Sequence, residues 1–271
     1  MAQENDVRAM VREHYGKVAT SPSGSVGCAP SCCAPAVGAS LKLGYSAEDL
    51  ASVPEGSEMG LGCGNPQAIA SLKAGETVLD LGSGGGFDCF LAARQVGPKG
   101  RVIGVDMTPA MIEKARANAA KMSADTVDFR LGEIEKLPVE DGTVDVILSN
   151  CVVNLSPDKR AVFQEAFRVL KPGGRLAIAD VVAIAPIAPE LRTAAMAISG
   201  CVGGAEEVAT IEALLHEAGF AQVRTSVKHE SRAFIADWLP GSGAENYVAS
   251  ATIEAIKPGA AKACCGPGGC G

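Results

Sequence analysis

The sequence of 271 residues has no long apolar run. A membrane-spanning helix needs roughly 18 apolar residues in a row, and the segment VVAIAPIAP is short and interrupted by Pro186 and Pro189. Residues 1–16 carry charges throughout and have no apolar core, unlike a signal peptide. We therefore expect no membrane contact and a cytoplasmic protein.

Positive charge and histidine are also scarce. The formal net charge is -7, and no run of basic residues or interleaving of basic and aromatic residues is present. Nucleic-acid binding depends on Lys and Arg contacts to phosphates, so we expect no nucleic-acid partner. The three histidines, His14, His216 and His229, are expected at the surface, and none is an obvious general base.

Cysteine, by contrast, is abundant, with ten residues. In an intracellular protein of this size, so many cysteines indicate metal, metalloid or redox chemistry rather than a disulfide scaffold. Cys89 is an exception, because it lies in a predicted helix and is expected to pack as a small buried residue. The tail cysteines either capture soft ions or belong to an accessory segment; they are Cys264, Cys265 and Cys270.

Strands and helices alternate from about Thr77 onward. This pattern predicts an α/β fold with a doubly wound, mostly parallel Rossmann-like sheet and an added substrate-binding lobe, in a chain that we expect to be a monomer. The predicted strands are 77–82, 101–106, 127–132, 144–150, 174–181, 220–228 and 232–236, and the predicted helices are 5–18, 86–96, 109–121, 158–170 and 205–217. The predicted divisions are an N-terminal helix and cysteine-bearing loop (1–74), a cofactor-binding core (75–182), a substrate lobe with closing strands (183–257) and a flexible cysteine-rich tail (258–271).

A glycine-rich turn, DLGSGGG, follows the first of these strands and opens a helix. A dinucleotide fingerprint would have a third glycine at position 87, where this chain has Phe87. Asp80, within the turn, would also repel a pyrophosphate. Both observations favour S-adenosylmethionine, which carries positive charge and no phosphate, and Gly82 and Gly84 would let the backbone approach it closely.

Residues at the ends of the neighbouring strands complete the predicted cofactor site. Asp106 ends the second strand, where an acidic side chain can accept both ribose hydroxyls, although it could instead cap the helix before Pro109. Met107 is expected to pack on the adenine. Residues 132–134 are expected to form the adenine end of the pocket, and Asn150 is expected to form its methionine end. The complete predicted set is Asp80, Gly82, Ser83, Gly84, Asp106, Met107, Gly132, Glu133, Ile134 and Asn150.

Three cysteines are candidates for a substrate site beside the predicted cofactor site. Cys151 directly follows the strand 144–150, so its thiol should face a ligand at the carboxyl edge of the sheet. Cys63 lies in GLGCGNP before the sheet, and Cys201 lies in ISGCVGGA after the fifth strand. Structural zinc sites favour closely spaced cysteine pairs, so these scattered thiols indicate group transfer to a thiol-loving acceptor instead.

Several segments together resemble the arsenite S-adenosylmethionine methyltransferases, a family with the class I methyltransferase fold, over residues 5–257. They are GLGCGNP, VLDLGSGGGFDCFLAA, GVDMTPAMIEKAR, GEIEKLP, SNCVVNLSPDKRAVFQEAFRVLKPGGRLAIAD and SGCVGGA. The resemblance implies that Cys63, Cys151 and Cys201 hold trivalent arsenic, and that Cys32 or Cys33 takes part in thiol–disulfide chemistry. It also implies arsenite and methylarsenite as substrates in arsenic detoxification, and glutathione or thioredoxin as the thiol reductant.

The chemistry of arsenic agrees with this resemblance. Trivalent arsenic is soft and prefers thiolates, and three of them leave it pyramidal with a lone pair free to attack a methyl group. No general base is then needed, and the protein contributes proximity and orientation. Two alternatives remain: a carbon methyltransferase of the quinone or sterol type, which needs no thiols, and a non-catalytic metalloid-sequestering protein, which needs no cofactor turn.

Overall fold

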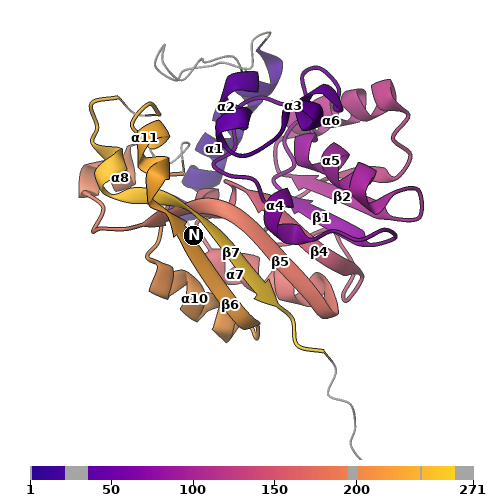
Figure 1. Cartoon of the computed structure of the whole chain (residues 1–271). Helices are drawn as coiled ribbons and strands as arrows, with labels where there is room; N and C mark the ends of the chain where they lie inside the picture. The colour runs from indigo at the N-terminus through magenta and orange to yellow at the C-terminus, as the bar shows by residue number, and fades with distance from the viewer. Residues whose placement is uncertain (1, 22–35, 195–200, 239, 260–271) are drawn as a thin grey trace, which may run out of the picture.

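The computed structural model describes residues 2–21, 36–194, 201–238 and 240–259. A seven-stranded sheet with the order β3-β2-β1-β4-β5-β7-β6 forms its centre (Figure 1). The first five strands are parallel, and β7 runs antiparallel to both β5 and β6, which confirms the predicted mostly parallel, doubly wound sheet. The strands are β1 (Thr77–Leu81), β2 (Arg101–Asp106), β3 (Val127–Leu131), β4 (Val144–Asn150), β5 (Leu170–Ala183), β6 (Ala221–Lys228) and β7 (Val248–Ile256).

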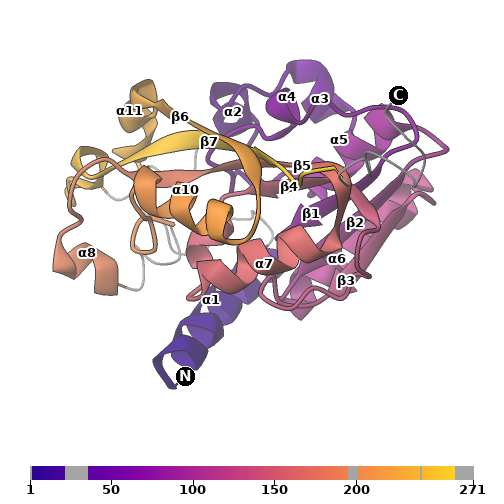
Figure 2. The same cartoon turned by 90° about the horizontal axis from the view of Figure 1, so that it is seen from below.

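Helices cover both faces of the sheet (Figure 2). Successive residues of a strand point to opposite faces, so Val78 of β1 packs in one apolar cluster and Leu79 in another. The first cluster includes residues of α4 (Gln67–Ala70), α5 (Phe87–Val96) and α6 (Pro109–Met122), and the second includes residues of α7 (Lys159–Val169) and α10 (Val208–Glu217). Burial on both faces explains why these strands read as almost continuous apolar runs.

The predicted N-terminal helix is α1 (Ala2–Thr20), and it packs beside α6 and the short 3-10 helix η1 (Val153–Leu155). Arg12 of α1 donates a hydrogen bond to the backbone oxygen of Met107 and pairs with Glu133. Arg8 pairs with Glu135, in the connection between β3 and β4. These contacts hold α1 against the carboxyl edge of the sheet, and the helices α2 (Ala36–Lys42) and α3 (Ala47–Ala51) follow it in the chain.

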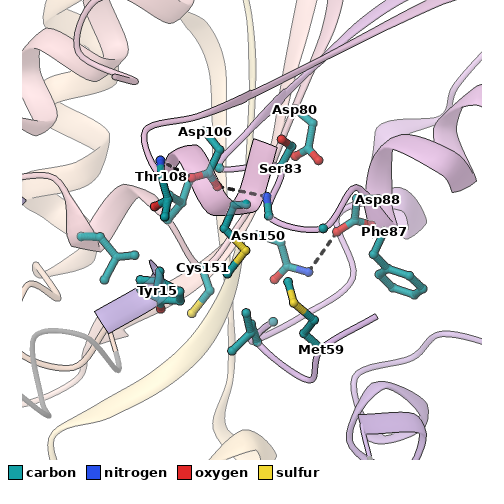
Figure 3. A pocket seen from close by; sticks show the side chains of 18 of the residues that line it. Tyr15, Met59, Asp80, Ser83, Phe87, Asp88, Asp106, Thr108, Asn150 and Cys151 are labelled. Carbon is teal, nitrogen blue, oxygen red and sulfur yellow. Dashed lines mark hydrogen bonds between the residues drawn. The ribbon is translucent and has the colours of Figure 1, made fainter. Parts of the chain in front are cut away.

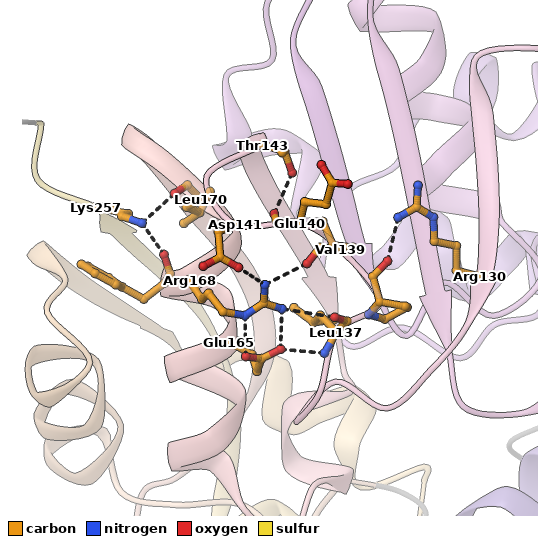
Figure 4. Close-up of polar contacts among 12 residues, drawn as sticks. Arg130, Leu137, Val139, Glu140, Asp141, Thr143, Glu165, Arg168, Leu170 and Lys257 are labelled. Carbon is orange, nitrogen blue, oxygen red and sulfur yellow. Dashed lines mark hydrogen bonds and ion pairs between the residues drawn. The ribbon is translucent and has the colours of Figure 1, made fainter.

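Arg168 of α7 fastens the connection between β3 and β4, which carries Glu135 (Figure 4). Its guanidinium donates to the backbone oxygens of Leu137, at 3.2 Å, and Val139, at 2.9 Å. It also pairs with Glu165, whose carboxylate accepts a 2.7 Å hydrogen bond from the backbone of Leu137. Arg168 holds the pKa of Glu165 below its usual value despite partial burial.

The prediction of a strand at 232–236 is wrong. Arg232–Ile235 forms the helix α11, which follows the 3-10 helix η2 (His229–Ser231), and Ile235 is fully buried. The last strand of the chain is β7, which lies between β5 and β6 in the sheet. The sequence did not predict it because it contains several alanines with little intrinsic strand preference. Its pairing with β5 over nine residues stabilises it instead.

The remaining elements are short and lie after β5. They are α8 (Pro189–Thr193) and the 3-10 helix η3 (Ala244–Asn246). Strands β6 and β7 belong to the same sheet as the cofactor-binding core, while the predicted division of the chain into segments stays a prediction. Among the residues that the structure describes, no helix is long and apolar enough to cross a membrane. Cys28, Cys32, Cys33 and the tail cysteines lie outside these residues.

Candidate active site

A cavity opens at the carboxyl edge of β1, β2 and β4, where the strand order of the sheet reverses (Figure 3). Ligands of open α/β sheets bind at this position. The cavity and its open mouth contain about 1090 Å³ of empty space. The predicted cofactor residues that line it are Asp80, Gly82, Ser83, Gly84, Asp106, Met107, Ile134 and Asn150.

The glycine turn wraps closely around the end of β1. The backbone amides of Gly82 and Ser83 both donate to the backbone oxygen of Val105 in β2. Gly82 has a φ of 70°, and a Cβ there would lie 2.4 Å from a methyl group of Val152. Only glycine therefore fits, and the turn leaves room for a ligand beside the backbone.

Asp106 has the structural role that the sequence left open, while its role in cofactor binding stays a prediction. Its carboxylate accepts hydrogen bonds from the backbone amides of Gly84, at 3.0 Å, and Thr108, at 2.8 Å. It therefore fixes both the glycine turn and the start of α6, and it also faces the cavity. Each carboxylate oxygen has two lone pairs, so the same group can accept hydrogen bonds from a ligand. Burial raises the pKa of Asp106.

Two further carboxylates, Asp80 and Asp88, give the cavity wall an acidic character. Burial and the neighbouring Asp88 raise the pKa of Asp80 well above its usual value. The hydroxyl of Tyr45 lies 2.8 Å from the Asp88 carboxylate and donates to it. A cationic ligand would relieve the repulsion between these carboxylates, so the site fits the positively charged cofactor that the sequence predicts.

Two predicted cofactor residues do not line the cavity. Gly132 is a packing residue, because a Cβ there would lie 2.8 Å from the ring of Pro138. Glu133 pairs with Arg12 of the N-terminal helix. The sequence missed Tyr45 and Asp88, which do line the cavity. Asp88 directly follows the glycine turn and Phe87, which is a usable signal, whereas Tyr45 stands in no motif.

The three predicted cysteines pack in one cluster of buried residues at one end of the cavity. The sulfur atoms of Cys63 and Cys151 lie within 4.8 Å of each other. The Cys201 thiol lies 2.8 Å from the backbone oxygen of Cys151, and the Cys63 thiol lies 3.5 Å from that of Ala179. Cys151 also lines the cavity, so the cluster and the cofactor pocket are continuous.

The loop that carries Cys63 packs tightly because glycines flank the cysteine. A Cβ on Gly62 would lie 2.8 Å from the side-chain amide of Asn150, and one on Gly64 would lie 2.7 Å from the Cβ of Ala179. The GCG motif therefore lets the loop approach β4 and β5 closely. Ser250 of β7 adds a 2.6 Å hydrogen bond to the backbone oxygen of Cys63.

The other two cysteines have an unusual backbone conformation. Cys151 has a φ of 60° and Cys201 a φ of 65°, in the left-handed region that non-glycine residues rarely adopt. Each such residue costs about 1–2 kcal/mol. Strain of this kind collects at functional sites, where the surrounding structure enforces it.

The thiols are neutral in this environment. Burial raises the pKa of Cys63 to about 12. Burial also raises the pKa of Cys151 well above its usual value, and the hydrogen bond with Cys151, followed by burial, raises that of Cys201. All three are free thiols, as is Cys89, which is fully buried as predicted and donates to Asp80.

Asn150 connects the thiol cluster to the cofactor cavity. Its side-chain oxygen accepts a 3.1 Å hydrogen bond from the backbone amide of Cys63. Its NH2 group donates to the backbone oxygen of Gly64, at 2.9 Å, and to the hydroxyl of Tyr45, at 3.0 Å. One amide therefore positions the Cys63 loop and faces the pocket, where Figure 3 shows it between Cys151 and Asp88.

Comparisons with known proteins agree with this geometry. A family model for a methyltransferase domain matches residues 72–219, more than half of the chain. The arsenite methyltransferase of Halobacterium salinarum is 54% identical over 262 residues, which are 93% of this chain and 67% of that protein. The arsenite methyltransferase of Aquipseudomonas alcaligenes is 41% identical over 221 residues, 79% of this chain and 62% of that protein.

A solved structure is similar as well. The crystal structure of CrArsM, an arsenic(III) S-adenosylmethionine methyltransferase from Chlamydomonas reinhardtii, is 33% identical in sequence and has a TM-score of 0.62. The match covers 84% of this chain and 75% of that one. This chain thus spans about two thirds of the length of the two relatives described above.

Proposed function

Because the chain belongs to the arsenite methyltransferase family, we propose that it transfers the methyl group of S-adenosylmethionine to trivalent arsenic bound by its own cysteines. One observation carries this proposal. Cys63, Cys151 and Cys201 come from three distant parts of the sequence, yet they pack in one buried cluster, and Cys151 lines the cofactor cavity. Arsenite and methylarsenite are the proposed substrates.

Neutral thiols suit the binding of arsenite. Arsenous acid carries three hydroxyl groups, and each thiol can pass its proton to one hydroxyl, which leaves as water while an arsenic–sulfur bond forms. Three thiols therefore release three waters and no net proton. The raised pKa values of Cys63, Cys151 and Cys201 keep the thiols in the form that this exchange requires.

The cavity wall would hold the cofactor beside this centre. When bound, S-adenosylmethionine supplies a methyl group on a positively charged sulfonium. Asp80 and Asp88 offset the positive charge, and Asp106 accepts hydrogen bonds from the ribose hydroxyls. Gly82 lets the backbone approach the ligand, so these residues act by binding and orientation.

The three thiols leave the arsenic with one lone pair. This lone pair forms the new arsenic–carbon bond while the bond from the methyl group to sulfur breaks, which takes arsenic formally from the trivalent to the pentavalent state. Two electrons from a pair of thiols return it to the trivalent state and leave a disulfide. We propose that Cys63 and either Cys32 or Cys33 form this pair, and that glutathione or thioredoxin reduces it again.

The two alternatives explain less of the structure. A carbon methyltransferase of the quinone or sterol type would not need three adjoining thiols, and a sequestering protein would not need the glycine turn or its cavity. Reduced cysteines also favour a cytoplasmic protein, as proposed from the sequence, because disulfides are rare in that compartment. We propose that the enzyme acts there as a monomer.

The test is arsenic speciation after incubation with arsenite, glutathione and methyl-labelled S-adenosylmethionine. The proposal predicts labelled methylarsenicals with the native chain and none with Cys151→Ser. Cys89→Ser is the matched control, because Cys89 is equally buried, lies outside the thiol cluster, and serine can keep its hydrogen bond to Asp80. Loss of methylation in both variants would show that the effect is not specific to the cluster.

A further inference from the structure

Asp180 of β5 is a buried carboxylate that the proposed methyl transfer does not use. It is 2% exposed, and a carboxylate oxygen lies within 4.8 Å of the sulfur atoms of Cys63 and Cys151, which lie equally close to each other. The three residues come from the loop before the sheet, from the end of β4 and from β5. Sequence analysis did not single out this aspartate.

Arsenic has no need of this oxygen. Trivalent arsenic forms three bonds and prefers soft thiolates, which the three cysteines supply. A divalent d10 cation such as zinc instead takes a nearly tetrahedral set of four ligands, in which carboxylate oxygen and thiolate sulfur are both common. Two thiols and one carboxylate therefore make a set that suits such a cation better than it suits arsenic.

We propose that Cys63, Cys151 and Asp180 form a binding site for a thiophilic divalent cation of the Zn²⁺ and Cd²⁺ class. The cation would share two cysteines with the arsenic site, so cation and arsenite exclude each other. This exclusion rests on the proposed function, whereas cation binding itself does not. Each of the two thiols loses its proton to solvent when the cation binds, and the carboxylate enters as the third ligand.

The required movement is small. Ligand atoms around a tetrahedral zinc with bonds of about 2.3 Å lie about 3.8 Å apart, so the present separations of up to 4.8 Å must shrink by roughly 1 Å at most. Rotation of the Cys63 and Cys151 side chains can provide this. The Asp180 carboxylate is already fixed by the side chain of Asn154, at 2.9 Å, and by the backbone amide of Val181, at 2.7 Å.

Charge and access also support a cation here. The three ligands would carry three negative charges when bound, and the partly buried Lys159 lies close enough to act electrostatically on Asp180 and Cys201. A divalent ion together with this lysine balances the set. Cys151 lines the open cavity, so an ion can enter by the same route as arsenite, and water can take the fourth position.

Cadmium alone is the probe. All proteins in the experiment are full-length chains with serine at the six cysteines outside the described residues, so that only Cys63, Cys89, Cys151 and Cys201 remain. Affinity is measured by the absorption of sulfur-to-cadmium charge transfer, and arsenite affinity is measured in parallel. Asp180→Asn keeps the shape and the hydrogen bond from Val181 but weakens the ligand. Asp106→Asn is the control for a partly buried carboxylate away from the thiols.

The proposal predicts that two different variants each weaken the binding of a different ligand. Asp180→Asn should weaken cadmium binding at least tenfold and change arsenite affinity by no more than about twofold. Cys201→Ser should weaken arsenite binding at least tenfold and change cadmium affinity by no more than about twofold. Asp106→Asn should change neither. Equal cadmium affinity in the protein that keeps Asp180 and in Asp180→Asn would overturn the site. Cadmium binding that depends on Cys201 as strongly as on Cys63 would overturn it as well.

A second measurement decides the matter should Asp180→Asn not fold. X-ray absorption at the cadmium edge of the unsubstituted site should show two sulfur ligands with oxygen completing the set, and a shell of sulfur alone would overturn the proposal. The outcomes also separate the two hypotheses. A chain that binds cadmium in this way but never methylates arsenite would refute the proposed function and leave the cation site in place.

Discussion

Replacing Asn150 with leucine should weaken arsenite binding more than cofactor binding. Leucine keeps the approximate size but can neither accept the hydrogen bond from the backbone amide of Cys63 nor donate one to the backbone oxygen of Gly64. Both of these backbone groups are buried, and a buried group without a partner costs about 1–3 kcal/mol. The two together amount to about 2–6 kcal/mol, which the variant avoids if the Cys63 loop moves away and these groups reach water. Arsenite binding must then return the loop to its position, and a cost at the lower figure corresponds to about 30-fold in affinity.

Calorimetric titration with arsenite and with S-adenosylmethionine measures the two effects separately. Asn118→Leu is the matched control, because Asn118 is a buried asparagine that donates a 3.0 Å hydrogen bond to the backbone of Gly85 in the cofactor turn. That variant should lose cofactor affinity and keep arsenite affinity. If Asn150→Leu folds and binds arsenite as tightly as the native chain, Asn150 does not position the Cys63 loop and the reasoning fails.

Three further predictions concern single residues. Asp106→Ala should weaken S-adenosylmethionine binding by about 1–3 kcal/mol in calorimetry and spare arsenite; unchanged cofactor affinity would remove Asp106 from the site. Arg168→Met should lower the free energy of unfolding at pH 7 by about 1–3 kcal/mol. Because Arg168 lowers the pKa of Glu165, the ion-pair part of its contribution is present above the unfolded pKa of about 4.3 and is lost as the pH falls through the lower, folded pKa. The hydrogen bonds from Arg168 to the backbone remain in acid, so the gap in unfolding free energy between the two proteins should narrow without closing, and a constant gap would contradict this. Cys63→Ser should abolish methylation of arsenite but spare methylarsenite, which has only two exchangeable positions; equal loss in rate assays with both substrates would refute that division.

Much of the fold could be predicted because its signals are local. The five parallel strands are short apolar runs between helices, and the glycine turn is a contiguous motif between a strand and a helix. The meeting of the thiols was also predictable in part, because Cys151 follows a strand and must lie at the ligand edge of the sheet. The resemblance supplied Cys63 and Cys201, whose positions relative to Cys151 no local pattern indicates.

The rest depends on contacts between distant parts of the chain. Strand β7 is stabilised by its pairing with β5, which outweighs the weak strand preference of its alanines. The role of Asn150 depends on the loop that carries Cys63, 87 positions away in the sequence. Asp180 is likewise one acidic residue in an apolar strand, and only the packing of β5 against β4 brings it to the thiols.

The most direct test of the account is the fate of the labelled methyl group in the native chain and in Cys151→Ser. Both proteins are incubated with arsenite, glutathione and methyl-labelled S-adenosylmethionine, and arsenic species are separated and counted. The account predicts labelled methylarsenicals from the native chain and none from Cys151→Ser, although both bind the cofactor. Near-normal methylation by Cys151→Ser, or none by a native chain that binds both ligands, would contradict the claim that arsenic receives the methyl group while held by these thiols.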